Sequence, residues 1–503
     1  MSSVRRGIQP WLLAGASALY FAWMGGLARL KPLWFDEVIT LYLARLPGPA
    51  LWEAIRHGAD NHPPLYHLAA SAATAWLGEG AFALRLPAML GSWVLGIALF
   101  RFVGRRCGPP YAWAALAFPL STAASAYAYE ARPYGLVLGG CGLALVGWQA
   151  AAGGGRRRPG LVGLALGLAI AAASHFYSVL IFLPLALGEC ARGLRRGAVD
   201  WPVWLAFAAG ATPLPFLVPL LEGLEPYRAG FWARPDALSI PRAYAFLLGP
   251  ALPFLVPLGV ASLRPGGPEA GPGAAADLPR HEVVAALAFA AFPIFTYALA
   301  VLVTGAFTGR YCLPAVAGFG ILVPFLAYRL GRGRPRAGWA LAAITMLGGV
   351  GGQAWDLWTL PDRFSAPAGF DRPFVVAARY PLPVVMWDPL MYLPLTRDLP
   401  ARDAARLVGV LERPLSTADL VLRSLSPYAP LRVVAFRRFV ADRRGAPFLL
   451  LSRPSQWRDV GWIVHGGRMT LLYQDPRWIL AHVAPPAGPV PGGRGSGGEM
   501  VRP

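Results

Sequence analysis

Long apolar runs, interrupted by short polar stretches, dominate the first 360 residues of the chain. Because a helix needs about 20 mostly apolar residues to cross a bilayer, each run is a candidate membrane span. We predict eleven spans, at residues 9–29, 84–104, 111–129, 134–152, 160–174, 178–191, 201–221, 243–262, 282–303, 312–330 and 337–357. The pattern therefore predicts a mainly helical, polytopic membrane protein.

Clusters of arginine in the short polar stretches predict the orientation, because positive charge stays on the cytoplasmic side. They lie at residues 5–6, 101–106, 156–158, 192–196 and 329–336. Successive clusters must be separated by an even number of crossings, so one of the three apolar runs before residue 101 cannot span. The run 65–77 is the shortest and contains His67, which indicates an interfacial helix on the outer face. Residues 30–83 then form one external loop.

The pattern changes after residue 361, where apolar runs become short and partly alternating. This spacing predicts a small external α/β domain over residues 361–486. We expect strands at 373–378, 383–388, 448–452, 469–474 and 478–483, and helices at 402–412 and 416–425. The loop 263–281 and the tail 487–503 are rich in glycine and proline, which is typical of flexible segments.

The composition excludes an ordinary soluble protein, because 56% of the residues are hydrophobic and only 14% are charged, against about 25% charged in soluble domains. The net charge of +20 comes from basic residues that sit between apolar runs, so it does not indicate nucleic-acid binding. The four cysteines lie far apart without metal-ligand spacing, at Cys107, Cys141, Cys190 and Cys312. They are typical of buried free thiols.

Acidic residues, in contrast, gather on the predicted external face. Asp36 and Glu37 follow an aromatic pair just beyond the first span. Carboxylates at a membrane boundary are unfavourable unless they have partners or a function, and one of them can act as a general base that the other orients. Alternatively, Asp36 is the N-cap of an interfacial helix over 37–45, with Glu37 favourably placed at the helix dipole.

A second external motif is the segment Asp-Asn-His-Pro-Pro-Leu-Tyr-His at residues 60–67. Its two prolines impose an extended backbone and set the chain direction. Asp60, His62 and Tyr66 are candidate substrate-binding residues, because a polar cluster before a rigid turn can hold side chains at a cleft. The alternative is an ordinary turn that starts an interfacial helix.

Three further motifs lie at predicted external helix ends. Glu130 and Arg132 can pair with each other or bind sugar hydroxyls and phosphate, while Arg310 is the best phosphate ligand because a guanidinium is always charged and forked. His175 is either a ligand or an ordinary interfacial polar residue. The remaining candidates are aromatic neighbours, Tyr134, Tyr177 and Tyr311. Helix packing would bring these motifs to one level, which suits a substrate with a charged head and a lipid tail.

In this order and spacing, the motifs resemble those of the GT-C membrane glycosyltransferases. They are WFDE at 34–37, DNHPPLYH at 60–67, ALRLP at 83–87, YEARPYGL at 129–136, SHFYS at 174–178 and GRYCLP at 309–314. The similarity covers residues 1 to about 330. It is greatest to bacterial members related to protein O-mannosyltransferases and the lipid A aminoarabinose transferase, including the RgtA/B/C/D-like group.

The resemblance implies an inverting glycosyltransferase in the bacterial plasma (inner) membrane. Such an enzyme takes its sugar from a polyprenyl-phosphate donor and passes it to a lipid, glycan or protein acceptor on the extracytoplasmic face. The first carboxylate of the pair, Asp36, would be the catalytic base. Arg310, and after it Arg132, would offset the phosphate charge. Asp60 would supply a second carboxylate.

The resemblance also bears on the substrate and on metals. The aminoarabinose branch has a Glu-Lys pair before the proline turn, where this sequence has Asn61 and His62. The external carboxylates are able to bind a divalent cation, but relatives are thought to work without one. We therefore expect neither a metal nor a cofactor.

Two other classes of protein remain as alternatives. A secondary transporter would place ionisable residues at mid-membrane and show repeat symmetry, and neither is visible in the sequence. A non-catalytic scaffold presenting residues 361–486 gives no reason for Asp36, Glu37 and Arg310 to lie at one level.

Overall fold

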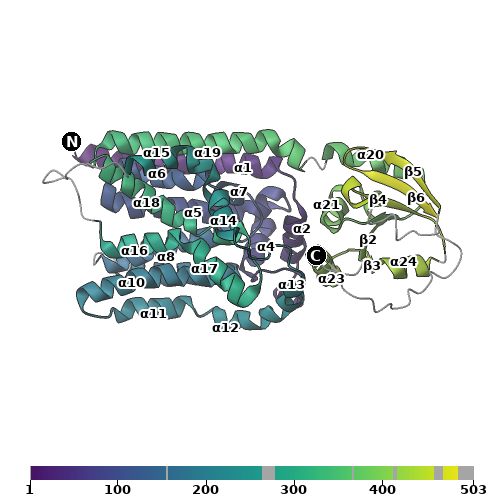
Figure 1. The fold of residues 1–503 in the computed structure, drawn as a ribbon, viewed down its shortest axis with the longest axis horizontal. Coiled ribbons are helices and arrows are strands. Elements are labelled where there is room, and N and C mark those ends of the chain that lie inside the picture. Colours follow the sequence, from purple (N-terminus) through teal and green to yellow (C-terminus); the bar gives the residue numbers. More distant parts are fainter. Residues whose placement is uncertain are drawn as a thin grey trace. The chain divides into compact units, whose positions relative to one another are not determined.

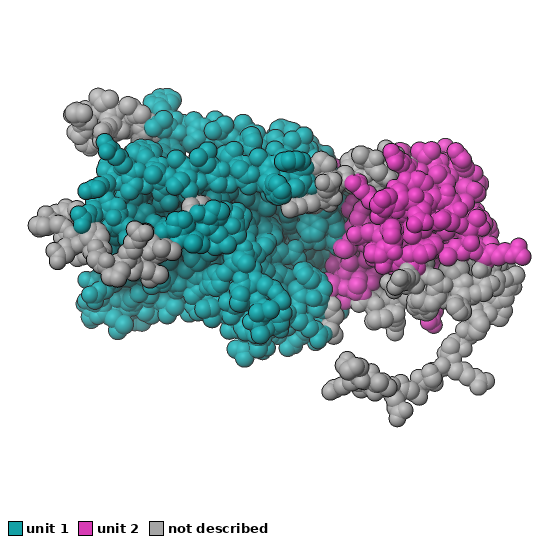
Figure 2. Space-filling model, turned by 45° about the horizontal axis from the view of Figure 1, so that its top comes forward, with its two compact units in different colours: residues 1–364 teal, residues 365–503 magenta. Residues whose placement is uncertain are grey.

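The computed structural model describes residues 2–153, 157–262, 278–364, 367–411, 416–443, 445–457 and 468–484. The chain divides into two compact units, residues 1–364 and 365–503, which Figure 2 shows in different colours. Most of the loop expected at 263–281 and the whole tail expected at 487–503 lie outside the described residues.

The first unit is built from helices (Figure 1). Its N-terminal part comprises α1 (Ser2–Leu30), α2 (Phe35–Ala44), α3 (Gly48–Arg56), α4 (Leu65–Leu77), α5 (Ala81–Cys107), α6 (Pro109–Ala117), η1 (Phe118–Ser121), α7 (Ala124–Ala128) and α8 (Tyr134–Ala152). The next part comprises α9 (Arg157–Ser174), η2 (Phe176–Ile181), α10 (Phe182–Arg196), α11 (Trp201–Gly210), α12 (Leu214–Leu217), η3 (Val218–Leu224) and α13 (Glu225–Gly230). The last part comprises α14 (Ser239–Leu248), η4 (Gly249–Ala251), α15 (Leu252–Ser262), α16 (Arg280–Ala290), α17 (Phe292–Leu299), η5 (Ala300–Thr304), η6 (Gly309–Cys312), α18 (Ala315–Leu330) and α19 (Pro335–Phe364).

The predicted spans coincide with continuous or broken helices, which confirms the polytopic helical fold. Among the described residues, five helical segments are long and apolar enough to cross a membrane. They are Pro10–Leu30, Ala81–Cys107, Tyr134–Ala152, Phe176–Arg196 and Trp201–Arg228. A pair of helices bent by 50°, Arg280–Ala290 and Phe292–Thr304, would make a sixth. The total of eleven crossings, and their orientation, stay predictions.

Several predicted spans are helices broken near prolines. The run 111–129, for example, becomes α6, η1 and α7, and Pro119 lies within η1. Such breaks are tolerated in a membrane when neighbouring helices or local turns satisfy the freed backbone groups. The run 65–77 forms the separate 13-residue helix α4, shorter than a span requires.

Glycines allow the central helices of this unit to pack closely. A Cβ atom on Gly91 of α5 would lie 2.2 Å from the carbonyl oxygen of Gly135 of α8. On the other side of α8, a Cβ atom on Gly167 of α9 would lie 2.4 Å from the amide nitrogen of Ala144. Small residues of this kind let helix backbones meet in membranes, where van der Waals packing replaces the hydrophobic effect. Helices α5, α8 and α9 therefore form a tightly packed core.

The second unit is a six-stranded sheet with helices α20 (Pro367–Ala377), α21 (Pro389–Asp398), α22 (Ala401–Ala404), α23 (Thr417–Leu425) and α24 (Phe436–Asp442). Its strands are β1 (Val384–Met386), β2 (Leu407–Leu411), β3 (Val433–Ala435), β4 (Phe448–Ser452), β5 (Arg468–Gln474) and β6 (Ile479–Ala484). They run in the order β3-β2-β1-β4-β6-β5. Strands β3, β2, β1 and β4 are mutually parallel. Strand β6 is antiparallel to both of its neighbours, β4 and β5.

Two predictions for this unit are wrong. The expected strand 373–378 lies mostly in α20, because this segment packs against β5 and β6 as a helix and tertiary contacts override strand propensity. The expected helix 402–412 is the short α22 followed by β2. The run Leu407–Val410 is buried without interruption, as expected for a strand covered on both faces.

We predict that Gly167→Ala lowers the free energy of unfolding by about 1–3 kcal/mol, because the new methyl group would strike the backbone of α8. Gly163→Ala is the matched control on the same helix, since its Cβ atom would meet nothing closer than 3.5 Å. We expect this control to be neutral or slightly stabilising. Thermal unfolding of both variants in the same detergent measures the difference. Equal midpoints would contradict the packing described here.

Candidate active site

A buried ion pair between Arg85 and Glu37 lies where the sequence motifs come together in the first unit, and it connects the segments that carry them. Arg85 donates from Nε to Glu37 Oε1 at 2.7 Å and from Nη2 to Oε2 at 2.5 Å, and both side chains are fully buried. The remaining Nη1 group donates to the carbonyl oxygens of Ala28 and Lys31, at the end of α1. One guanidinium from α5 therefore joins the end of α1 to the start of α2.

Glu37 also fixes the loop before α8, because its Oε1 atom accepts a hydrogen bond from the backbone N–H of Ala131 at 2.6 Å. Burial alone would raise the pKa of Glu37, but the charges of Arg85 and Lys31 outweigh it and lower the pKa. The carboxylate is thus ionised, buried and fully engaged. This placement argues against the catalytic role expected for Glu37, since no substrate can reach it without breaking the ion pair.

Asp36 precedes Glu37 and points in another direction, since successive helical residues are about 100° apart. Its Oδ2 atom lies 3.5 Å from Nη1 of Arg310, and its side chain is 18% exposed. Helix α2 begins at Phe35, with Trp34 as its N-cap. The interpretation of Asp36 as the N-cap is therefore wrong, and its carboxylate is not used to cap the helix.

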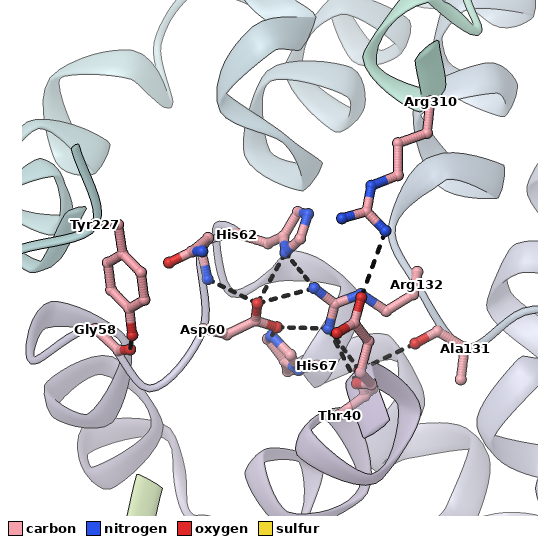
Figure 3. Close-up of polar contacts among 11 residues, drawn as sticks. Thr40, Gly58, Asp60, His62, His67, Ala131, Arg132, Tyr227 and Arg310 are labelled. Carbon is pink, nitrogen blue, oxygen red and sulfur yellow. Dashed lines mark hydrogen bonds and ion pairs between the residues drawn. The ribbon is translucent and has the colours of Figure 1, made fainter. Parts of the chain in front are cut away.

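Asp60 forms the centre of a second buried cluster (Figure 3). It receives two hydrogen bonds of 2.9 Å from Nη1 and Nη2 of Arg132, and Nε2 of His67 lies 3.2 Å from its Oδ2 atom. Burial alone would raise the pKa of Asp60, but the charge of Arg132 and contacts with His62 and His67 hold it well below its usual range. Asp60 is accordingly a buried counter-ion for Arg132.

Arg132 in turn fixes the position of Asp36. Its Nη1 group donates to the backbone carbonyl of Asp36 at 3.1 Å, and Thr40 donates to the same carbonyl at 3.2 Å. Arg132 is 3% exposed. Because both of its Nη groups donate to Asp60, Arg132 is less available to a phosphate than Arg310 is.

Glu130 and Arg132 do not pair with each other. Glu130 Oε2 instead lies 3.2 Å from Nζ of Lys31, on the segment after α1. Burial raises the pKa of Glu130, Lys31 opposes this effect and the nearby Glu37 adds to it.

Tyr66 lies behind the site rather than in it. It is fully buried and donates to the carbonyl oxygen of Leu84 at 2.9 Å. This bond holds α4 against α5. Tyr66 is therefore a packing residue in this structure, whereas the sequence motif made it a candidate substrate-binding residue.

The other predicted residues form a row of rings beside the Asp36–Arg310 pair. The ring of His175 lies 5.5 Å from that of Tyr134 and 5.0 Å from that of Tyr311, and Tyr311 stacks on Tyr177 at 4.6 Å. The guanidinium of Arg310 lies 6.0 Å from the centre of the Tyr134 ring. The structure thus brings together residues that are up to 275 positions apart, as the distance from Asp36 to Tyr311 in the numbering shows.

Of two cavities of similar size, the first is lined by three of these rings and the second reaches the row through Tyr127. In the first, of about 530 Å³, half of the lining residues are leucine, valine and phenylalanine, and Asn61, His175, Tyr177 and Tyr311 are among its polar residues. The other, of about 520 Å³, contains Lys31, Glu130, Asp356 and several hydroxyl groups. Tyr127 lines this second cavity and contacts Tyr134, which contacts His175 of the first.

Sequence reasoning missed Arg85, Lys31 and Thr40 as parts of the site. Arg85 carried a signal, since a charge at the start of an apolar run needs a buried partner. Thr40 carried none, because its role depends on the loop before α8. Among the residues that the structure describes, no group of three or more His, Cys, Asp or Glu side chains is arranged to hold a metal ion.

No protein-family model and no curated protein matches the sequence. The fold, however, is similar to that of ArnT from Cupriavidus metallidurans. Its apo structure superposes with a TM-score of 0.61 at 14% identity, covering 95% of this chain and 98% of that one. The structure of ArnT bound to undecaprenyl phosphate gives a TM-score of 0.60 at 13% identity, with 94% and 98% coverage. The chain therefore has an ArnT-like fold, and its long apolar helices are those of an integral membrane protein.

We predict that Glu37→Gln lowers the free energy of unfolding by about 3–5 kcal/mol, because it leaves the charge of Arg85 buried without its partner. Glu79→Gln is the matched control. It breaks an ion pair with Arg45 in the same region, but those side chains are 43% and 52% exposed, and such pairs contribute at most about 1 kcal/mol. Thermal unfolding and accumulation in membranes are the measurements. Similar losses in both variants would contradict a central role for the Arg85 pair.

Proposed function

We propose that this protein is an inverting glycosyltransferase that moves a sugar from a polyprenyl-phosphate donor to an envelope acceptor. The observation that carries the proposal is the Asp36 carboxylate, which faces Arg310 at 3.5 Å beside a row of rings that connects two cavities. The ArnT-like fold supports it, since one ArnT structure contains undecaprenyl phosphate. We place the reaction on the extracytoplasmic face of a bacterial plasma membrane, following the arginine distribution.

The apolar cavity suits the lipid part of the donor. Its leucine, valine and phenylalanine side chains match a hydrocarbon chain, while His175, Tyr177 and Tyr311 form a polar part. Arg310 lies next to these three residues in an adjoining small pocket. A lipid in the apolar cavity would therefore present its phosphate to the guanidinium of Arg310.

In the proposed reaction, Asp36 accepts the proton of an acceptor hydroxyl while the hydroxyl oxygen attacks the anomeric carbon. The bond between that carbon and the phosphate oxygen breaks, and the phosphate leaves with the electron pair. Arg310 stabilises the charge that develops on the phosphate. Attack from the face opposite the leaving group inverts the configuration of the sugar.

Glu37 and Arg132 are positioning residues in this proposal. Glu37 anchors α2 through Arg85, and Arg132 holds the backbone carbonyl of Asp36. Together they leave the Asp36 side chain little freedom to turn away from Arg310.

The second cavity suits a polar acceptor. Tyr127, Tyr129, Thr122 and Ser125 place hydroxyl groups in its lining, beside the charged side chains of Lys31, Glu130 and Asp356. Hydroxyl and carboxylate groups both form hydrogen bonds with sugar hydroxyls. A sugar hydroxyl is therefore the acceptor group that this lining favours.

The meeting of Asp36 and Arg310 also argues against the scaffold alternative, which requires no such encounter. It likewise reduces the need for a metal, since a permanent positive charge already stands where the phosphate would leave. We propose that transfer proceeds without a metal ion.

We predict that Asp36→Asn lowers sugar transfer by about 10²–10⁴-fold, because the amide cannot accept the proton. The protein should still accumulate, since the Asp36 side chain is partly exposed. The measurement is mass spectrometry of envelope glycolipids and glycans from cells that carry either form. Glu53→Gln, an exposed acid of the same loop, is the control and should retain activity. An active Asp36→Asn protein would remove the basis of the proposal.

We also predict that a chelator such as EDTA leaves the transfer rate within about twofold of its untreated value, because Arg310 supplies the positive charge beside Asp36. The assay uses purified full-length protein in lipid nanodiscs. A loss of activity that added Mg²⁺ or Mn²⁺ restores would show that a metal is required.

A further inference from the structure

Two histidines beside the active site have no role in the mechanism above. His62 lies on the loop before α4, and His175 is the residue immediately before η2. Their ring centres are 4.9 Å apart, with an angle of 61° between the planes, and both side chains are buried. They thus form a contacting imidazole pair near the proposed phosphate position.

Both rings make their polar contacts through Nδ1. Nδ1 of His175 accepts from the backbone N–H of Tyr177 at 3.1 Å. Nδ1 of His175 is therefore an acceptor, and its neutral ring carries the proton on Nε2. Nδ1 of His62 lies 2.9 Å from Oδ1 of Asp60, which only accepts, and 2.6 Å from Nη2 of Arg132, which only donates. When the Asp60 contact is a hydrogen bond, Nδ1 of His62 carries the proton, and its Nε2 is the basic nitrogen that can take up another and then donate to an anion. Among the described residues, neither Nε2 atom makes a hydrogen bond.

The surroundings of the pair keep it neutral when the site is empty. The charged or titratable groups that face it are Asp60, Arg132, Arg310, Tyr134, Tyr177 and Tyr311. Burial and the charge of Arg132 lower the pKa of His62 to about 4, although Asp60 opposes them. Burial, His62 and Arg310 hold the pKa of His175 well below its usual range.

An anion at this position would reverse that balance. His175 lines both the apolar cavity and the small pocket with Arg310. A phosphate that reaches Arg310 from the apolar cavity must therefore approach His175, whose ring contacts His62. Its negative charge would favour a protonated ring and offset the repulsion from the two guanidinium groups.

We propose that His62 and His175 form a proton-linked half of the phosphate site, donating from Nε2 and taking up one proton when the lipid-linked phosphate binds. This inference rests on the proposed function. Arg310 provides the permanent charge of the site, and the histidines provide a charge that appears only with the ligand.

The proton also balances the charge of the reaction. The donor is a phosphodiester with one negative charge. Breaking the sugar–phosphate bond leaves a monoester, whose second ionisation lies near pH 6. A protonated imidazole beside it stabilises the extra negative charge of the leaving phosphate, while Asp36 holds the proton from the acceptor.

The direction of the pH dependence follows from linkage. Because binding raises the pKa of an imidazole, affinity is highest at low pH and falls as the pH rises through the bound-state pKa. We expect the affinity to fall about tenfold between pH 5.5 and 7.5, since one pKa unit corresponds to a factor of ten.

The test uses a short-chain polyprenyl phosphate methyl ester, a diester whose own charge stays constant over this range. Calorimetric titration of the full-length protein in nanodiscs, in two buffers of different ionisation enthalpy, counts the protons taken up. We expect an uptake approaching one proton per bound diester near pH 6. Dimethyl phosphate, which has the same head group without a lipid, should bind at least tenfold more weakly, because it does not fill the apolar cavity.

Glutamine variants separate proton uptake from binding, because the amide keeps an N–H donor but cannot be protonated. The double variant His62→Gln with His175→Gln should bind the diester with no proton uptake and no pH dependence. His57→Gln, at an exposed histidine of the same loop, should behave as the unmodified protein.

The outcomes distinguish this inference from the proposed function. Binding by the unmodified protein without proton uptake, or unchanged uptake in the double variant, would overturn the role of the histidines alone. Failure of the unmodified protein to bind the diester at any pH would overturn both. The pH dependence of the unmodified protein tests the inference even if the double variant does not fold.

Discussion

The buried pair of Arg85 and Glu37 is the interaction on which the rest of the site depends. The guanidinium of Arg85 joins α1, α2 and α5, and the carboxylate of Glu37 also accepts a hydrogen bond from the backbone N–H of Ala131. A buried charge without its partner is strongly unfavourable, so these contacts must form together. The orientation of α2, and with it the direction in which Asp36 points, follows from this single pairing.

Under the proposed function, the charges of the site are divided between supporting residues and reacting residues. The short contacts, Arg85 with Glu37 and Arg132 with Asp60, are buried and closely paired. The pair of Asp36 and Arg310 is longer and partly exposed, at 22% for the arginine and 18% for the aspartate. A loosely paired carboxylate held by rigid neighbours is what a general base requires, because it can exchange its partner for a substrate. The supporting pairs therefore make the reactive pair possible.

The sequence predicted the fold and the meeting of the site residues, because apolar runs define helices and the polar motifs follow the helix ends at one level. The residue pattern alone did not separate Asp36 from Glu37, and only the family resemblance singled out Asp36 as the base. That distinction depends on where α2 begins and on Arg85, which lies 48 positions from Glu37. The partner of Arg132 was unpredictable for the same reason, since Asp60 is brought to it only by packing. In the second unit, residues 373–378 look like a strand locally, and only their contacts with the sheet make them helical.

The size of the apolar cavity has a consequence for the choice of lipid carrier. A volume of about 530 Å³ is that of a pocket for a drug-sized molecule, far smaller than a long polyprenyl chain. Under the proposed function, the protein would enclose only the isoprene units nearest the phosphate and leave the remainder among the acyl chains of the bilayer. Such an enzyme would recognise the phosphate end of its carrier lipid and would not depend on the total length of the chain. Bacteria that make carriers of different lengths could therefore all supply its donor.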